Sequence, residues 1–216
     1  MFSILFWLLA FVIGITIHEA SHAWMANRLG DPTPKLMGRL TLNPIKHYDP
    51  IGTTMLLVLV ILRALGTPVI PFGWAKPVGF DPYNLKNPRK DTAIISLAGP
   101  GSNLIVAVFL AMILKLFVGP FSPYTLLATA IFYPIIILNV SLAIFNLIPV
   151  YPLDGEKILS GILPQKDAYE FERFMKRYGT ILLLFIIFPT IGGSSPLSLV
   201  ISPIINFLLN LLVPMV

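Results

Sequence analysis

The chain has 216 residues, of which 56% are hydrophobic and 12% charged, with a formal net charge of +5 and no cysteine. So few charged side chains could not cover a water-soluble globule, because soluble domains carry about 25% charged residues. The absence of cysteine excludes disulfides, thiolate metal sites and cysteine nucleophiles. At about 20 residues per membrane-spanning helix, we expect an all-α membrane protein: a polytopic bundle of five to six spans with a re-entrant or extended segment.

The first expected element is a membrane-spanning helix. Residues 2–17 form an apolar run, and helix-compatible residues continue it to Leu29. A cleaved signal peptide is the alternative, but no basic residue precedes Arg28 and no small-residue cleavage site follows the run. We therefore expect this segment to be the first span.

A basic, proline-containing loop over residues 28–49 separates this span from a short apolar run over 51–62, which Arg63 ends. Twelve apolar residues are short for a full span. A re-entrant or interfacial segment over 51–75 is therefore the favoured interpretation, although run length alone does not exclude a full crossing.

The second half of the chain contains two long apolar stretches, residues 92–118 and 124–150. Residues 165–178 then place apolar side chains on one helical face, which is typical of a helix in the headgroup plane or of a plain connector: Ala168, Phe171, Phe174, Met175 and Tyr178. We divide the chain into a metal-site transmembrane core over 1–163, an interfacial amphipathic helix over 164–178 and a C-terminal transmembrane hairpin over 179–216.

The positions of the basic residues favour one topology. If 51–75 dips into the membrane and returns, then loops 28–49, 76–91 and 151–178 share one face and hold thirteen of the fifteen Lys and Arg residues. A full crossing would divide them, against the positive-inside rule. We therefore expect a multi-pass protein of the cell membrane with its N-terminus outside and its basic loops cytoplasmic. The positive charge is attributed to topology, so we expect no nucleic-acid partner.

A metal-binding pattern, His18-Glu19-Ala20-Ser21-His22, follows the first apolar run. Two histidines four residues apart lie on one helix face, so both imidazoles can bind one tetrahedral ion while the neighbouring Glu19 points toward bound water. Zinc lowers the pKa of such a water to about 7, and a carboxylate can act as its general base. Ionisable residues are costly in a membrane helix and indicate a functional site. A proton-relay or packing cluster in a transporter is the alternative.

A catalytic zinc site needs a third protein ligand. The only other histidine, His47, lies in the basic loop, and we expect it at the membrane interface. Asp154 lies where Pro149 and Pro152 interrupt the span that begins at residue 124. Irregular backbone at membrane depth occurs inside protein or around a wet cavity. A helix N-cap is the alternative role for Asp154, but we favour the ligand.

Three motifs together resemble the site-2 protease family of intramembrane zinc metallopeptidases. They are His18 to His22, the break Ala98-Gly-Pro-Gly-Ser-Asn103, and Phe145-Asn-Leu-Ile-Pro-Val-Tyr-Pro-Leu-Asp154-Gly155. Their order and separation match over roughly residues 10–160. The resemblance implies a peptide-bond hydrolase with one zinc ion per chain that performs regulated intramembrane proteolysis. It also implies that the substrate is a membrane-anchored protein that is cut within or near the lipid bilayer.

The resemblance implies roles for three residues of the expected site. Asp154 would complete the zinc site of His18 and His22. Asn146 would lie near the scissile carbonyl, where its amide could stabilise the oxyanion, although an interhelical hydrogen bond is its alternative role. Asn103 would lie near the active cavity, whereas the neighbouring glycines would let helices approach closely.

The chain departs from the family pattern in two ways. The second motif often reads Asp-Gly-Gly in the family, whereas this chain has Asp154-Gly155-Glu156. We expect Glu156 to face the cytosol rather than to bind zinc. The chain also has no room for regulatory PDZ or CBS domains, so we expect substrate selection by the membrane part or by partners.

Residues 71–78, Pro-Phe-Gly-Trp-Ala-Lys-Pro-Val, cannot form a regular helix. Extended backbone here could pair with an unwound substrate by strand addition. An interfacial loop anchored by Trp74 is the alternative. For the whole protein, the rival function is a transporter or channel whose intramembrane His, Glu and Asp side chains move a metal ion or proton. The sequence indicates no oligomeric state.

Overall fold

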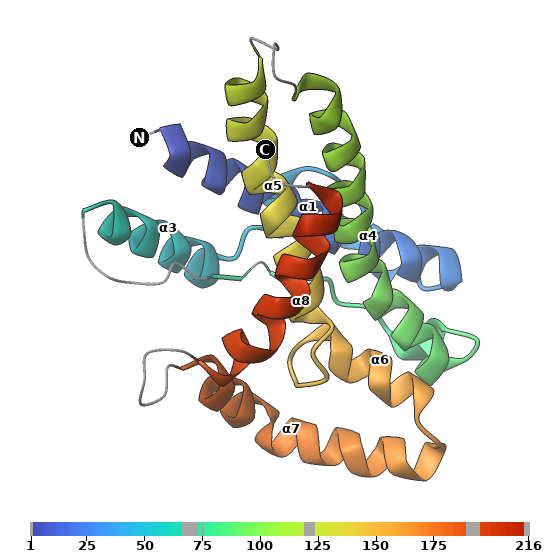
Figure 1. Cartoon of the computed structure of the whole chain (residues 1–216). Coiled ribbons are helices and arrows are strands. Elements are labelled where there is room, and N and C mark those ends of the chain that lie inside the picture. Colours follow the sequence, from blue (N-terminus) through green and yellow to red (C-terminus); the bar gives the residue numbers. More distant parts are fainter. Residues whose placement is uncertain (1, 66–72, 75, 119–123, 189–194, 214–216) are drawn as a thin grey trace.

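The computed structural model describes residues 2–65, 73–74, 76–118, 124–188 and 195–213 (Figure 1). All regular structure in these residues is helical, which confirms the expected all-α class. The elements, in chain order and with η for short 3-10 helices, are α1 Phe2–Leu29, α2 Thr33–Leu36, η1 Pro44–His47, α3 Pro50–Ala64, η2 Pro82–Asn84, α4 Pro88–Phe117, α5 Thr125–Asn146, α6 Asp154–Ile162, α7 Gln165–Ile187 and α8 Pro196–Leu212.

Among the described residues, α1, α4 and α5 are long and apolar enough to cross a membrane, and α3 and α8 are shorter apolar helices. The protein is therefore a polytopic helical membrane protein, while the number of five to six spans stays a prediction. Helices α4 and α5 run side by side in Figure 1, and buried small residues such as Ala107 and Ala128 lie between them. A Cβ added at Gly14 of α1 would lie 2.9 Å from Leu142 Cδ1 of α5, so the glycine gives the leucine side chains of α5 room against α1.

The described parts of segment 51–75 lie next to one another. The described residues Gly73 and Trp74 lie against the first turns of α3. A Cβ added at Gly52 would lie 2.5 Å from the Trp74 carbonyl oxygen, and one at Gly73 would lie 2.7 Å from Leu56 Cβ. Only glycine allows the two backbones to approach so closely. A segment that begins and ends at one place fits the dip-and-return path, although residues 66–72 and 75 of the expected segment lie outside the described residues.

Helix α7 runs without interruption through residue 178, where we expected an interfacial helix to end and a membrane hairpin to begin. Gly179 lies within this helix and packs closely: a Cβ there would lie 2.7 Å from Tyr151 Cβ. On the predicted apolar face, Ala168 and Met175 are buried, whereas Tyr178 is exposed. Residues on both sides of the expected boundary thus belong to one helix, and the division into an interfacial helix and a hairpin stays a prediction.

The connection after α1 is fixed by one buried carboxylate. Asp31 Oδ1 accepts hydrogen bonds from the Thr33 backbone and hydroxyl and from Asn84 Nδ2, at 3.0, 2.6 and 2.8 Å. Its Oδ2 accepts from the Asp81 amide at 2.8 Å. These bonds join the chain after α1 to η2, 50 residues later, and so hold the extended residues 76–80 beside α1.

Candidate active site

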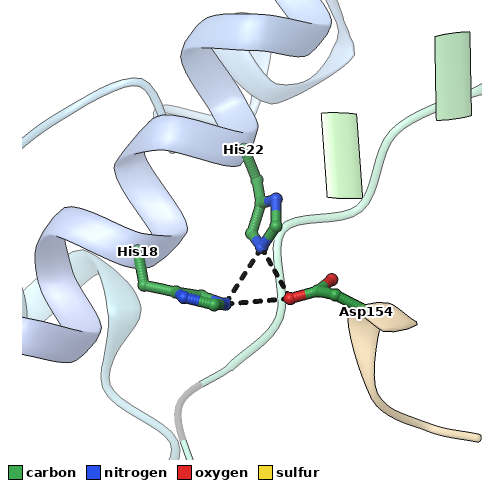
Figure 2. A group of neighbouring side chains, drawn as sticks. All are labelled: His18, His22 and Asp154. Carbon is green, nitrogen blue, oxygen red and sulfur yellow. Dashed lines mark hydrogen bonds and ion pairs between the residues drawn. The ribbon is translucent and has the colours of Figure 1, made fainter. Parts of the chain in front are cut away.

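Helices α1 and α6 bring three potential metal ligands together in the core (Figure 2). His18 Nε2 lies 3.0 Å from His22 Nε2 and 3.1 Å from Asp154 Oδ2, and His22 Nε2 lies 3.3 Å from the same carboxylate oxygen. In a tetrahedral zinc site with bonds of about 2.0–2.1 Å, neighbouring ligand atoms are about 3.3–3.4 Å apart. The three atoms therefore have nearly the spacing of one face of a zinc tetrahedron.

The outer hydrogen bonds of the two imidazoles determine which nitrogens carry protons. His22 Nδ1 lies 2.7 Å from the Ile95 carbonyl oxygen, which only accepts, so Nδ1 is the donor. His18 Nδ1 lies 2.7 Å from Asn103 Oδ1 and donates to it in the same way. In the neutral rings both Nε2 atoms then present lone pairs to the Asp154 carboxylate. Three electron-rich atoms at 3.0–3.3 Å with no proton between them repel one another, and a cation among them removes that repulsion. The donor set therefore fits a zinc ion.

Gly99 of α4 gives the histidine pair room against the neighbouring helix. A Cβ added there would overlap His22 Nε2 and would lie 2.6 Å from His22 Cε1 and 2.7 Å from His18 Cε1. Carbon atoms in contact are normally about 3.5–4.0 Å apart. The expected role of small residues in close approach is confirmed at Gly99, whereas a Cβ at Gly101 would meet nothing within 4 Å.

The turn between α5 and α6 carries Asp154 to the histidines. Asp154 is the first residue of α6, and Leu153 occupies the N-cap position without a side-chain cap. Asp154 thus points its carboxylate at the imidazoles rather than capping its helix, which supports the ligand role. A Cβ at the next residue, Gly155, would overlap the carbonyl oxygens of Leu147 and Ile148. The Asp-Gly pair therefore lets the turn fold tightly against the end of α5.

Glu19 is held by residues 76–80, the non-helical segment before η2. The Val78 amide donates to Glu19 Oε2 at 2.9 Å, and the Lys76 amide donates to the His47 carbonyl at 3.0 Å. The non-helical backbone expected here is confirmed for the described residues 73–74 and 76–80. Its amides connect it to the carboxylate beside the metal ligands and to the loop before α3.

Three other residues considered in the sequence lie outside the ligand group. Asn146 Nδ2 donates to the Leu142 carbonyl of its own helix at 2.9 Å. His47, the last residue of η1, is 1% exposed, and its Nε2 donates to the Thr41 carbonyl, so it is buried inside the protein; its expected place at the membrane interface stays a prediction. Glu156 is 5% exposed, so the expectation that it faces the cytosol is wrong, because α6 packs it inside the protein.

Asn103 lies beside His18, as the resemblance implied, and it leads to a residue that the sequence analysis missed. Asn103 Nδ2 donates to the Gly14 carbonyl at 3.0 Å and to Asn139 Oδ1 at 2.8 Å. The only signal for Asn139 in the sequence was a polar side chain in the middle of an apolar span, which an ordinary interhelical hydrogen bond would equally explain.

The fold and the ligand group define a helical membrane metalloprotein, and comparison with known sequences gives its family. The sequence profile described as peptidase family M50 matches residues 6–125 and 124–186. The chain belongs to this family, the site-2 proteases, and the matched segments leave no room for a PDZ or CBS domain between them.

Individual relatives agree with this assignment. The chain is 36% identical over 195 residues to YwhC of Bacillus subtilis, covering 84% of each protein. It is 35% identical over 148 residues to Rip2 of Mycolicibacterium smegmatis, covering 67% of this chain and 52% of Rip2. The names of these two proteins describe them provisionally as zinc metalloproteases. It is 25% identical over 168 residues to the zinc metalloprotease MJ0392 of Methanocaldococcus jannaschii, covering 76% of this chain and 37% of MJ0392. No solved structure matches the chain.

The chain is therefore a zinc metalloprotease that acts on protein, with zinc as its cofactor. The assignment as a metalloprotease takes the place of the alternative function, a transporter or channel, which the His, Glu and Asp side chains had left open in the sequence analysis.

Proposed function

We propose that the chain is an intramembrane zinc endopeptidase that cleaves membrane-anchored proteins within or near the lipid bilayer. His18, His22 and Asp154 would bind one zinc ion per chain. The observation that carries the proposal is the convergence of their three lone-pair atoms at 3.0–3.3 Å, inside a protein whose described residues include three membrane-length helices. Ionisable groups are rarely kept at such depth without a function.

When bound among these ligands, zinc would polarise the scissile carbonyl and make water a nucleophile at neutral pH. Glu19 is the general base in this proposal. Its Oε2 accepts the Val78 amide, so its other oxygen takes the proton from the attacking water and returns it to the leaving amine. Asn146 would contribute to the oxyanion site after its amide turns from the Leu142 carbonyl toward the substrate.

The extended segment 76–80 would hold the substrate strand. A helical substrate hides its carbonyls in its own hydrogen bonds, so it must unwind before cleavage. Main-chain groups of 76–80 can pair with the unwound strand. The Val78 amide already contacts Glu19, so a strand on this segment would lie next to the base.

The same proposal includes a location. The protein would lie in the cell membrane as a multi-pass protein, with its N-terminus outside and its basic loops cytoplasmic. Because α1 carries its histidines toward its C-terminal end, the cut would then fall on the cytoplasmic side of the bilayer centre.

The experiment compares wild type with Glu19→Gln in vesicles that contain a single-span model peptide. We measure zinc content and peptide cleavage side by side. Removal of the base keeps all three ligands, so we expect zinc to remain and cleavage to fall by at least about 100-fold. Cleavage that survives at the wild-type rate would exclude Glu19 as the base, and cleavage only of soluble peptides would exclude the intramembrane substrate.

A further inference from the structure

We propose that Asn139 on α5 is a positioning residue for the zinc site, which acts through Asn103 to keep His18 in its metal-binding form. This inference rests on the proposed role of His18 as a zinc ligand. Asn139 lies on a different helix from all three candidate ligands, and none of the motifs singled out in the sequence includes it.

Asn139, Asn103 and His18 form one buried chain of hydrogen bonds across three helices. Both asparagines are completely buried and His18 is 6% exposed. The distances are 2.7 Å from His18 Nδ1 to Asn103 Oδ1, 2.8 Å from Asn103 Nδ2 to Asn139 Oδ1, and 2.8 Å from Asn139 Nδ2 to the Ile135 carbonyl. Each link is short enough for a well-formed hydrogen bond.

The far end of the chain determines its direction. The Ile135 carbonyl can only accept, so the Asn139 group beside it is the NH₂ and the group facing Asn103 is the oxygen. That oxygen requires the Asn103 NH₂ on its side, which leaves the Asn103 oxygen for His18. His18 Nδ1 must then carry the proton, and Nε2 has the lone pair that a metal needs. A backbone carbonyl of α5 thus sets the tautomer of a ligand on α1.

Loss of the Asn139 oxygen would weaken the restraint on the orientation of the Asn103 amide. The Asn103 amide would then be oriented on that side only by its bond to the Gly14 carbonyl. A rotated Asn103 presents N–H to His18 Nδ1, which moves the imidazole proton to Nε2 and blocks the ligand atom. His22 has no such dependence, because its Nδ1 donates directly to the Ile95 backbone. Asn139 therefore acts on one of the two histidines.

Two substitutions at position 139 separate positioning from packing. Asn139→Asp keeps an oxygen for Asn103 but places a second oxygen against the Ile135 carbonyl, so it should lower the thermal stability of the apoprotein while it retains zinc affinity. Asn139→Leu buries no charge, so it should disturb the fold less, yet it removes the acceptor. Outer hydrogen-bond partners of metal ligands typically change affinity by about 10–100-fold, and we expect about a tenfold loss in Asn139→Leu.

The assay is zinc affinity by chelator competition on the purified full-length protein in detergent, with the apoprotein melting temperature measured in parallel. The Co²⁺ absorption spectrum reports ligand geometry independently of activity. The matched control is Thr129→Val, which removes a buried hydroxyl without a hydrogen-bond partner from the same helix. We expect the control to keep the zinc affinity of wild type. If Asn139→Leu does not fold, Asn139→Ser replaces it, because its shorter hydroxyl does not reach Asn103.

The proposal is overturned if zinc affinity follows melting temperature across the variants, or if Asn139→Leu binds zinc as tightly as wild type. Failure of the proposed function is recognised separately. In that case His18→Ala, which removes the ligand itself, would leave zinc binding unchanged, whatever the variants at position 139 do.

Discussion

Replacement of Gly99 by alanine should destroy the zinc site through a single methyl group. The added Cβ would lie 2.6–2.7 Å from the Cε1 atoms of both histidines, where carbon contacts normally need about 3.5–4.0 Å. The rings or the helices must therefore move by about 1 Å, whereas metal–ligand distances tolerate only about 0.2 Å. A misplacement of about 1 Å in a reacting group costs about 100-fold in rate, so we expect at least that loss of cleavage together with reduced zinc content.

The control for this prediction is Gly101→Ala in the same helix, where a Cβ would meet nothing within 4 Å. Inside a helix, alanine is favoured over glycine by about 1 kcal/mol, so both substitutions gain the same local stabilisation. Zinc content and cleavage of a single-span model peptide are measured for both in detergent. If Gly99→Ala retains wild-type zinc content and activity, then α4 does not support the histidines as closely as the structure shows.

Two further substitutions test the surroundings of the site. Val78→Pro removes the amide that holds Glu19, and a hydrogen bond to a charged group contributes about 1.5–3 kcal/mol. Cleavage should therefore fall about tenfold or more, with zinc content unchanged. The control Val78→Thr keeps the amide and should remain active. Asp31→Asn should lower the free energy of unfolding by about 1–3 kcal/mol at pH 7, because either orientation of the amide turns its NH₂ group toward a backbone donor, that of Thr33 or that of Asp81. Burial alone would raise the pKa of Asp31, but the hydrogen bonds from Thr33, Asn84 and Asp81 hold the pKa below its ordinary value. The stabilisation by Asp31 is thus complete above about pH 4 and is lost as the pH falls through the lowered pKa. The melting temperatures of wild type and variant should therefore converge in acid. A difference in melting temperature that is independent of pH would contradict this account.

The sequence predicted those parts of the site that depend on local spacing. The spacing of four positions from His18 to His22 places both on one helix face wherever the helix lies, and the prolines before Asp154 indicated a break in the span. The length of the apolar runs also predicted the long spans. At Asn103, the resemblance placed the side chain near the cavity but did not identify the atom that it contacts.

The remaining features depend on how helices cross, which no local pattern encodes. Asn139 becomes part of the site only because α5 passes α4 at the level of Asn103. Glu156 looked like a solvated charge, yet α6 packs against α4 and α7 and buries it. At residue 178, where the boundary between the interfacial helix and the hairpin was placed, α7 continues, and the division of the chain stays a prediction.

Metal binding and helix packing should be coupled in this protein. The candidate ligands come from α1 and from the turn into α6. Both imidazoles are already fixed by hydrogen bonds: His22 bonds to the Ile95 carbonyl of α4, and His18 bonds to the asparagine pair of α4 and α5. Asp154 is the candidate ligand without such support, because its position depends on the tight Asp-Gly turn. Without an ion, the repulsion among the three lone-pair atoms falls mainly on Asp154, because among the described residues its carboxylate contacts only the two imidazoles. Zinc should therefore stabilise the docking of α6 against α1 and α4 more than it stabilises the three long helices themselves.

Addition of zinc at about 100 times its Kd adds about 2.7 kcal/mol to the folded state. Hydrogen exchange should show that protection gained mainly in residues 147–162, and protection gained equally along α4 and α5 would contradict this division.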